Sequence, residues 1–96
     1  MNTSLRTLRN YVSSQGNVPF DDWLESLKDR KARAIIRNRI NRVRQGNMGD
    51  ADSLGGGVFE LRIHYGPGYR VYYGELGRTI VILLCGGTKR SQRRDI

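Results

Sequence analysis

Cysteine, histidine and long apolar runs are scarce in this chain of 96 residues, and each scarcity excludes a class of structure. Cys85 has no second thiol for an internal disulfide, and one cysteine with one histidine, His64, cannot complete a usual zinc site. No segment reaches the roughly 18 apolar residues of a membrane span, and the first residues lack the apolar stretch of a secretory signal. We therefore expect one cytoplasmic domain over residues 1–96, with no bound metal or cofactor.

Acidic side chains are also few. Nine Asp and Glu stand against 17 Lys and Arg, which gives a net charge of +8. The excess is uneven, because residues 28–44 hold eight basic side chains and a single acid, Asp29. Such an imbalance predicts a polyanionic partner: nucleic acid, an acidic protein or an anionic membrane surface. The alternative is a soluble, arginine-rich surface, but for so small a domain we favour nucleic acid or an acidic protein.

Two amphipathic helices are predicted in the first half of the chain. The first begins at Pro19, because proline and early acidic residues suit the first turn of a helix. Its apolar side chains recur at spacings of three and four: Phe20, Trp23, Leu24 and Leu27. The second helix spans 29–45 and ends before Gly46, since glycine tolerates the left-handed C-cap conformation. Its buried stripe consists of Ala32, Ile35, Ile36, Ile40 and Val43.

The strands are predicted from alternation of apolar and polar residues. A weak strand is expected over 5–12, and the glycine-rich stretch 47–57 is expected to be a loop. Residues 58–65 and 69–73 alternate with a period of two on either side of a Gly-Pro-Gly turn, which is typical of a hairpin. The run 79–85 is apolar on both faces and is predicted to be the central strand. These elements predict an α+β fold in the order β-α-α-β-β-β, with a small antiparallel sheet and a helical hairpin packed on one face.

The polar residues of the predicted hairpin are expected on the sheet face turned away from the helices. They are Arg62 and His64 in its first strand and Arg70 and Tyr72 in its second. Two guanidinium groups, an imidazole and a phenol on one face suit phosphate contacts and base stacking. This hypothesis requires Arg62 and Arg70 to point to the same side of the sheet.

Several motifs follow one another in a specific order after residue 18. They include Pro19-Phe20-Asp21-Asp22-Trp23-Leu24, Val58-Phe59-Glu60-Leu61-Arg62-Ile63, Gly66-Pro67-Gly68-Tyr69-Arg70-Val71-Tyr72, and Leu83-Leu84-Cys85-Gly86-Gly87-Thr88-Lys89 with Ser91-Gln92. In this order they resemble the RelE/ParE superfamily of toxins from bacterial type II toxin–antitoxin modules. The likeness is strongest to the HigB-like branch, the addiction module killer proteins.

The resemblance implies a function as well as a fold. RelE-like toxins enter the ribosomal A site and cut the mRNA there, and a cognate antitoxin silences them. The implied partners are therefore an antitoxin carrying a helix-turn-helix, the ribosome and mRNA, with operator DNA reached only through the antitoxin and no membrane. The implied activity is that of an endoribonuclease that needs no metal or cofactor, because a ribose 2′-hydroxyl attacks the adjacent phosphate.

The resemblance also implies roles for basic residues. Arg70 corresponds to the arginine that RelE toxins use on the scissile phosphate, and Arg62 stands where RelE has a lysine. Lys89 matches a basic position beside the leaving group, and Arg90 is its possible substitute. Planar guanidinium groups suit this task because they can clamp two phosphate oxygens.

The proton-transfer groups are less well defined. His64 is a candidate because imidazole titrates nearest neutral pH, although a solvated histidine on an exposed strand is the alternative. Tyr72 is the candidate for base stacking. RelE places a catalytic tyrosine in its C-terminal helix, whereas residues 91–96 contain none. The general acid and base therefore remain open.

The basic side of the second helix is a further candidate for RNA contact, through Arg33, Arg37 and Arg44. The alternative is a solvated surface that the antitoxin covers. Two other functions also stay open for the whole chain. One is inhibition of DNA gyrase without nuclease chemistry, as in ParE-like members of the fold. The other is a degenerate toxin that acts only in an antitoxin complex on operator DNA.

Overall fold

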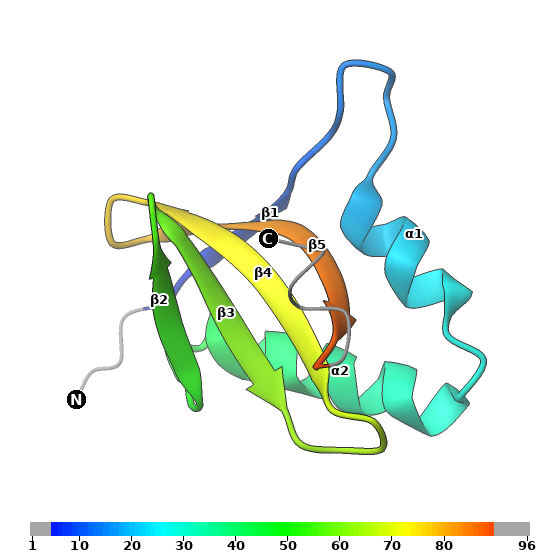
Figure 1. Cartoon of the computed structure of the whole chain (residues 1–96). Coiled ribbons are helices and arrows are strands. Elements are labelled where there is room, and N and C mark those ends of the chain that lie inside the picture. The colour runs from blue at the N-terminus through cyan, green and yellow to red at the C-terminus, as the bar shows by residue number, and fades with distance from the viewer. Residues whose placement is uncertain (1–4, 90–96) are drawn as a thin grey trace.

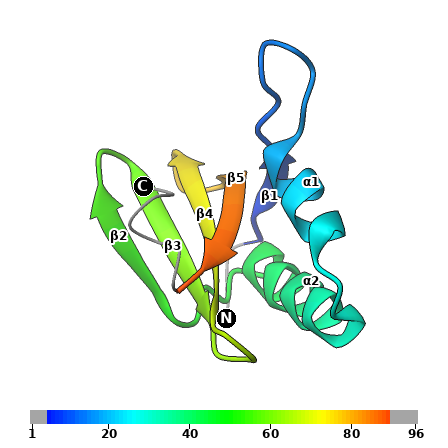
Figure 2. The same cartoon turned by 45° about the vertical axis from the view of Figure 1, so that its right-hand side comes forward.

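The computed structural model describes residues 5–89, which form two helices and a five-stranded sheet (Figure 1). The elements in chain order are β1 (Thr7–Asn10), α1 (Pro19–Ser26), α2 (Arg30–Arg44), β2 (Ala51–Gly55), β3 (Val58–Ile63), β4 (Tyr69–Leu76) and β5 (Ile80–Thr88). Both helices lie on the same side of the sheet (Figure 2). The predicted α+β class, with a helix pair on one face of the sheet, is confirmed.

Both helices begin where the sequence predicts. Pro19 occupies the first turn of α1 together with Asp21 and Asp22. Asp29 caps α2, because its Oδ1 accepts hydrogen bonds from the backbone N–H groups of Lys31 and Ala32 at 2.9 and 3.1 Å. Neither helix of the described residues is long and apolar enough to cross a membrane.

The sheet is mixed, with the strand order β1-β5-β4-β3-β2. β3, β4 and β5 pair antiparallel with one another, as predicted; the unpredicted β2 pairs antiparallel with β3, and β1 pairs parallel with β5. The prediction that residues 79–85 form the central strand is wrong, because β4 occupies the middle of the sheet. β5 is nevertheless an interior strand, since β1 covers its outer edge, and this explains its apolar composition.

The predicted loop 47–57 contains a strand, β2, and this is the main error of the sequence-based fold. β2 is an edge strand that pairs only with β3 in the described residues, with an irregular register between Ser53 and Gly55. Its sequence has no β-branched or aromatic residue, so propensity gives no sign of it. The consequence is functional, because β2 brings acidic side chains alongside β3.

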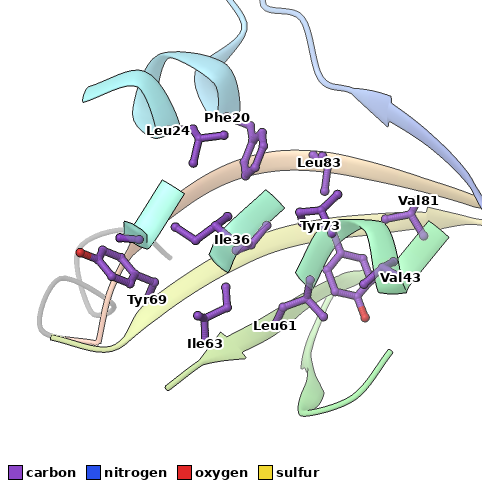
Figure 3. Close-up of a cluster of buried hydrophobic side chains, with 13 residues drawn as sticks. Phe20, Leu24, Ile36, Val43, Leu61, Ile63, Tyr69, Tyr73, Val81 and Leu83 are labelled. Atoms are coloured by element: carbon purple, nitrogen blue, oxygen red, sulfur yellow. The ribbon is translucent and has the colours of Figure 1, made fainter. Parts of the chain in front are cut away.

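The core lies between the helices and one face of the sheet, here called the core face (Figure 3). Leu61, Val71 and Val81 are wholly buried on this face, and Ile36 and Val43 of α2 are wholly buried against it. The opposite side, which carries Arg62 and Arg70, is called the open face. The hairpin alternation therefore divides as predicted, with apolar residues on the core face.

The predicted core position of Trp23 is confirmed by its packing. The indole is partly buried, lies 6.1 Å from the ring of Tyr69 and covers Gly86 of β5. A Cβ atom at Gly86 would collide with the Trp23 ring. Glycine at this position therefore allows α1 to pack closely on β5, which continues past the predicted end at Cys85 to Thr88.

Candidate functional site

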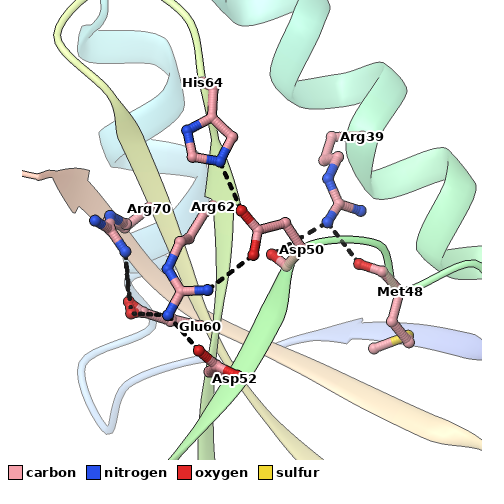
Figure 4. A network of polar contacts seen from close by, with 8 residues as sticks. All are labelled: Arg39, Met48, Asp50, Asp52, Glu60, Arg62, His64 and Arg70. Carbon is pink, nitrogen blue, oxygen red and sulfur yellow. Dashed lines mark hydrogen bonds and ion pairs between the residues drawn. The ribbon is translucent and has the colours of Figure 1, made fainter.

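Arg62 and Arg70 lie directly opposite each other in the register of β3 and β4. Opposed residues of an antiparallel pair share a face of the sheet, so the geometric condition set by the sequence is met. On the other side of Arg62, the carbonyl oxygen of Asp50 accepts the Arg62 backbone N–H at 2.9 Å. Asp50 just before β2, Arg62 in β3 and Arg70 in β4 therefore form a row across the sheet (Figure 4).

Arg62 is held by carboxylates from β2 and its approach. Its Nη1 donates to Oδ1 of Asp50 at 2.8 Å, and its Nη2 donates to Asp52. Nη2 also lies 4.0 Å from a carboxylate oxygen of Glu60. These contacts, with Asp52 first and Asp50 second, raise the pKa of Arg62 above its ordinary value. The guanidinium is thus charged, and carboxylates fix its orientation at both Nη1 and Nη2.

Arg70 pairs with Glu60 in a buried part of the open face. Nη1 of Arg70 lies 2.8 and 3.2 Å from the two carboxylate oxygens of Glu60. The Glu60 side chain is 1% exposed and that of Arg70 is 11% exposed. A carboxylate this buried requires a cationic partner, so Arg70 contributes to the stability of the fold as well as to the candidate site.

His64 follows the last residue of β3 and extends from the edge of the network (Figure 4). Its Nε2 lies 2.6 Å from Oδ2 of Asp50, and its side chain is 75% exposed. The pKa of Asp50 is lowered, first by the hydrogen bond to His64 and then by the bond to Arg62. Asp50 therefore links the imidazole to the nearest guanidinium.

Arg39 connects this network to the helical layer. The side chain comes from α2, is 7% exposed, and donates from Nη2 to the backbone oxygens of Met48 at 2.5 Å and Asp50 at 3.4 Å. Gly49 lies against the guanidinium with φ +62°, and a Cβ there would be 2.6 Å from Nη2. Burial lowers the pKa of Arg39. Arg39 thus holds the segment that carries Asp50.

Lys89 is placed at the same end of the sheet as Arg70. Its backbone N–H donates to the carbonyl oxygen of Gly68 at 2.7 Å, in the turn that leads into β4, and the residue is exposed. Tyr72, by contrast, is only 1% exposed. The prediction that Tyr72 stacks on a base is therefore wrong for this structure, because the buried ring offers no surface to a ligand.

Of the remaining predicted residues, the three that the structure describes do not join this cluster. Arg90 lies outside the described residues, as does the tyrosine-free segment 91–96. Arg33, Arg37 and Arg44 belong to α2, in the helical layer on the opposite side of the sheet. Arg33 donates to the backbone oxygen of Leu27, Arg37 lies 3.5 Å from Glu25, and Arg44 donates to Asn41 at 2.7 Å.

Arg37 and Arg44 line a separate hollow of about 340 Å³ between β1 and the two helices. Its other lining residues are Leu8, Arg9, Asn10, Phe20, Asp21, Leu24, Ile40, Asn41 and Leu83. The lining is mixed, with apolar side chains beside arginines and asparagines. The predicted basic residues thus divide into two regions, the open face and this helical side.

The acidic residues of the open face were missed by the sequence analysis. Asp50, Asp52 and Glu60 lie against two guanidinium groups and one imidazole, so each acidic side chain has a nitrogen partner. The available signal was the spacing of two between Asp50 and Asp52, which is the period of a strand. Among residues 5–89, no group of three or more Asp, Glu, His and Cys side chains is arranged to hold a metal ion.

Comparison with known proteins gives two similarities. The family described as phage derived protein Gp49-like matches residues 22–95 of this chain, which include every described residue of the open-face network. A protein of Haemophilus influenzae, described only as an uncharacterized protein, is 52% identical over 85 residues. That alignment covers 88% of this chain and 86% of the Haemophilus protein.

Proposed function

The chain belongs to the Gp49-like family of phage-derived proteins, within the group of toxin–antitoxin toxins, and from this premise we propose that it is a ribosome-dependent mRNA endonuclease. The toxin acts in the manner of the HigB-like branch. It inhibits translation by cutting mRNA in the ribosome, and a cognate antitoxin neutralises it. The observation that supports this proposal is the placement of Arg62, Arg70 and the exposed His64 on one face of the sheet.

The proposed reaction is attack by the ribose 2′-oxygen on the adjacent phosphorus. A bond forms between O2′ and phosphorus and the bond from phosphorus to O5′ breaks, which leaves a 2′,3′-cyclic phosphate and a 5′-hydroxyl. His64 accepts the 2′-hydroxyl proton, and the exposed Lys89 ammonium donates a proton to the leaving O5′. Arg62 and Arg70 stabilise the negative charge that develops on the phosphorane oxygens.

Substrate binding must compete with the carboxylates that already occupy the arginines. Asp52 is the weakest competitor, because its side chain is 62% exposed and contacts only Arg62 among the described residues. We expect a phosphate oxygen to take its place at Nη2 of Arg62. Both Arg70 bonds to Glu60 use Nη1, so a phosphate is expected to bind through Nη2 of that residue.

The basic residues of α2 are assigned to partner binding. Arg33, Arg37 and Arg44 lie on the opposite side of the molecule from the proposed cleavage site, so they cannot contact the same phosphate. We propose that they contact ribosomal RNA when the toxin is active and the antitoxin when it is silenced. The mixed apolar and cationic lining beside Arg37 and Arg44 suits either use.

The experiment that tests the nuclease is mapping of mRNA 5′ ends in growing cells that express the chain. Arg70→Lys keeps a positive charge near Glu60 but loses the planar fork of the guanidinium. The matched control is Arg78→Lys, the same change at an exposed residue between β4 and β5. We expect growth arrest and codon-phased cuts in translated messages with the wild type and control, and a loss of about 100-fold or more with Arg70→Lys.

Other outcomes would assign a different function. Intact mRNA together with altered DNA supercoiling would contradict the nuclease and favour inhibition of gyrase. Absence of any growth effect would contradict both and favour a protein that acts only in an antitoxin complex on operator DNA.

A further inference from the structure

We propose that Asp50 is a positioning residue of the candidate cleavage site, an inference that rests on the proposed function. Asp50 orients His64 so that its Nδ1 faces the substrate as a proton acceptor, and it fixes Arg62 relative to that nitrogen. The sequence did not predict this role for Asp50, because residues 47–57 were expected to be a loop and β2 was not expected there.

The Asp50 carboxylate bridges His64 and Arg62. Oδ2 of Asp50 lies 2.6 Å from Nε2 of His64, while Oδ1 accepts from Nη1 of Arg62 at 2.8 Å. Each oxygen thus holds a different member of the site. The distance between the imidazole and the guanidinium is set by a single carboxylate rather than by two independent side-chain rotamers.

Asp50 also determines the tautomer of the His64 imidazole. A carboxylate accepts hydrogen bonds and cannot donate one while ionised, so Nε2 of His64 carries the proton in the neutral ring. The lone pair then resides on Nδ1, the nitrogen that Asp50 does not contact. With 75% of its side chain exposed, His64 has little other restraint, and the contact with Asp50 holds the ring.

Asp50 is itself held in place by backbone contacts. Its carbonyl oxygen accepts from the backbone of Arg62 and from the buried guanidinium of Arg39, which also holds Met48. Gly49 lets that guanidinium approach the backbone closely. A continuous set of contacts therefore runs from α2 through Arg39 and Asp50 to His64 (Figure 4).

Asp52 provides a matched control within the same strand region. It has the same charge and also contacts Arg62, but its contacts do not include His64. A change from aspartate to asparagine removes one negative charge at either site. Only at Asp50 does the change act on the imidazole.

The test compares Asp50→Asn with Asp52→Asn by two measurements. The first is ¹⁵N NMR of the imidazole, which is unambiguous because His64 is the single histidine. In Asp50→Asn the amide oxygen is required by Arg62, so the amide NH₂ group faces Nε2 and favours the Nδ1–H tautomer. We expect the Nε2–H tautomer in the wild type and in Asp52→Asn, and the Nδ1–H tautomer in Asp50→Asn.

The second measurement is cleavage of mRNA on programmed ribosomes. We expect Asp50→Asn to lower kcat about 100-fold with little change in KM, because the ring presents the wrong nitrogen. Asp52→Asn should lower KM, because a carboxylate that competes with the phosphate at Nη2 of Arg62 is lost, and it should not reproduce the loss in kcat that Asp50→Asn causes. Adding His64→Ala to Asp50→Asn should cause little further loss, since both changes remove the same proton acceptor.

Different experimental results would overturn the nuclease and the role of Asp50. A wild type that cuts no mRNA on the ribosome overturns the nuclease and with it the role of Asp50. A wild type that cuts, with undiminished or faster cutting by Asp50→Asn, overturns the present inference alone. So does an unchanged His64 tautomer in Asp50→Asn.

Discussion

On the core face of the sheet, Leu61, Val71 and Val81 are wholly buried under the helices. Glu60 and Arg62 flank Leu61 in β3, and on the open face they belong to a network of ion pairs. Alternate residues of one strand thus serve different purposes, with apolar contact on one side and charge pairing on the other. We therefore expect a substitution at Leu61 to lower the stability of the fold, and a substitution at the next residue, Arg62, to lower RNA cleavage.

The largest effect on stability is expected at Leu61. Leu61→Ala removes a side chain with no exposed surface, and such changes cost about 3 kcal/mol of unfolding free energy. Urea denaturation of Leu61→Ala and of its neighbour variant Arg62→Lys measures the contrast between faces. Arg62→Lys should unfold near the wild-type midpoint while losing cleavage. Equal destabilisation by both variants would remove the proposed division between the faces.

Glu60 is expected to be an exception to this division between the faces. It lies on the open face yet is buried, so its substitution should affect both stability and cleavage. Glu60→Gln weakens the partner of Arg70 while keeping an oxygen acceptor, and we expect a loss of about 2 kcal/mol. Cleavage should fall too, because Arg70 loses its restraint. The measurement is chemical denaturation combined with the ribosome assay. A change in stability below about 0.5 kcal/mol would show that the pair contributes little to folding.

Gly49 lies where the helical layer is connected to the open face. Gly49→Ala imposes a left-handed backbone on alanine, at about 1–2 kcal/mol, and also places a Cβ against the guanidinium of Arg39. Gly56→Ala is the matched control, since Gly56 has φ +61° and open space for a Cβ. Denaturation should show Gly49→Ala to be less stable than Gly56→Ala. Identical losses would mean that the Arg39 contact is easily displaced.

The smallest effect is expected at Asp29, on the helical side. Hydrogen bonds from the backbone of Ala32 and from Tyr65 lower the pKa of Asp29. A lowered pKa stabilises the fold above the unfolded value near pH 4, and this contribution is lost as the pH falls through the folded value. Thermal melts should place wild type a few degrees above Asp29→Asn at neutral pH, with no difference in strong acid. A difference independent of pH would contradict this origin.

The sequence was sufficient for the core face. The spacing in the helices and the alternation in β3 and β4 identified Ile36, Leu61 and Val71, because burial of apolar area imposes a period that a sequence displays. Pro19 marked the start of α1, because its fixed φ suits the first turn and its missing N–H costs no helical hydrogen bond there. The second helix was predicted to start at residue 29, which is the residue that caps α2.

The sequence did not identify the acidic residues of the open face. The basic members Arg62 and Arg70 were found, but Asp50 and Asp52 were assigned to a loop because β2 is held by pairing with β3 rather than by its own propensity. Arg39 was not distinguished from the other basic residues of 28–44, since a buried arginine within a run of arginines has no local signature. Tyr72 shows the same limit, because burial on the open face depends on neighbours distant in sequence.

The central claim is that the open face is a phosphate-cleaving site. The most direct measurement is the chemistry of the RNA ends when purified protein acts on ribosomes programmed with a defined mRNA. The account predicts a 2′,3′-cyclic phosphate and a 5′-hydroxyl at an A-site codon with wild type and Arg78→Lys, and about 100-fold less product with Arg70→Lys. Intact mRNA with the wild type, or undiminished cutting by Arg70→Lys, would contradict it.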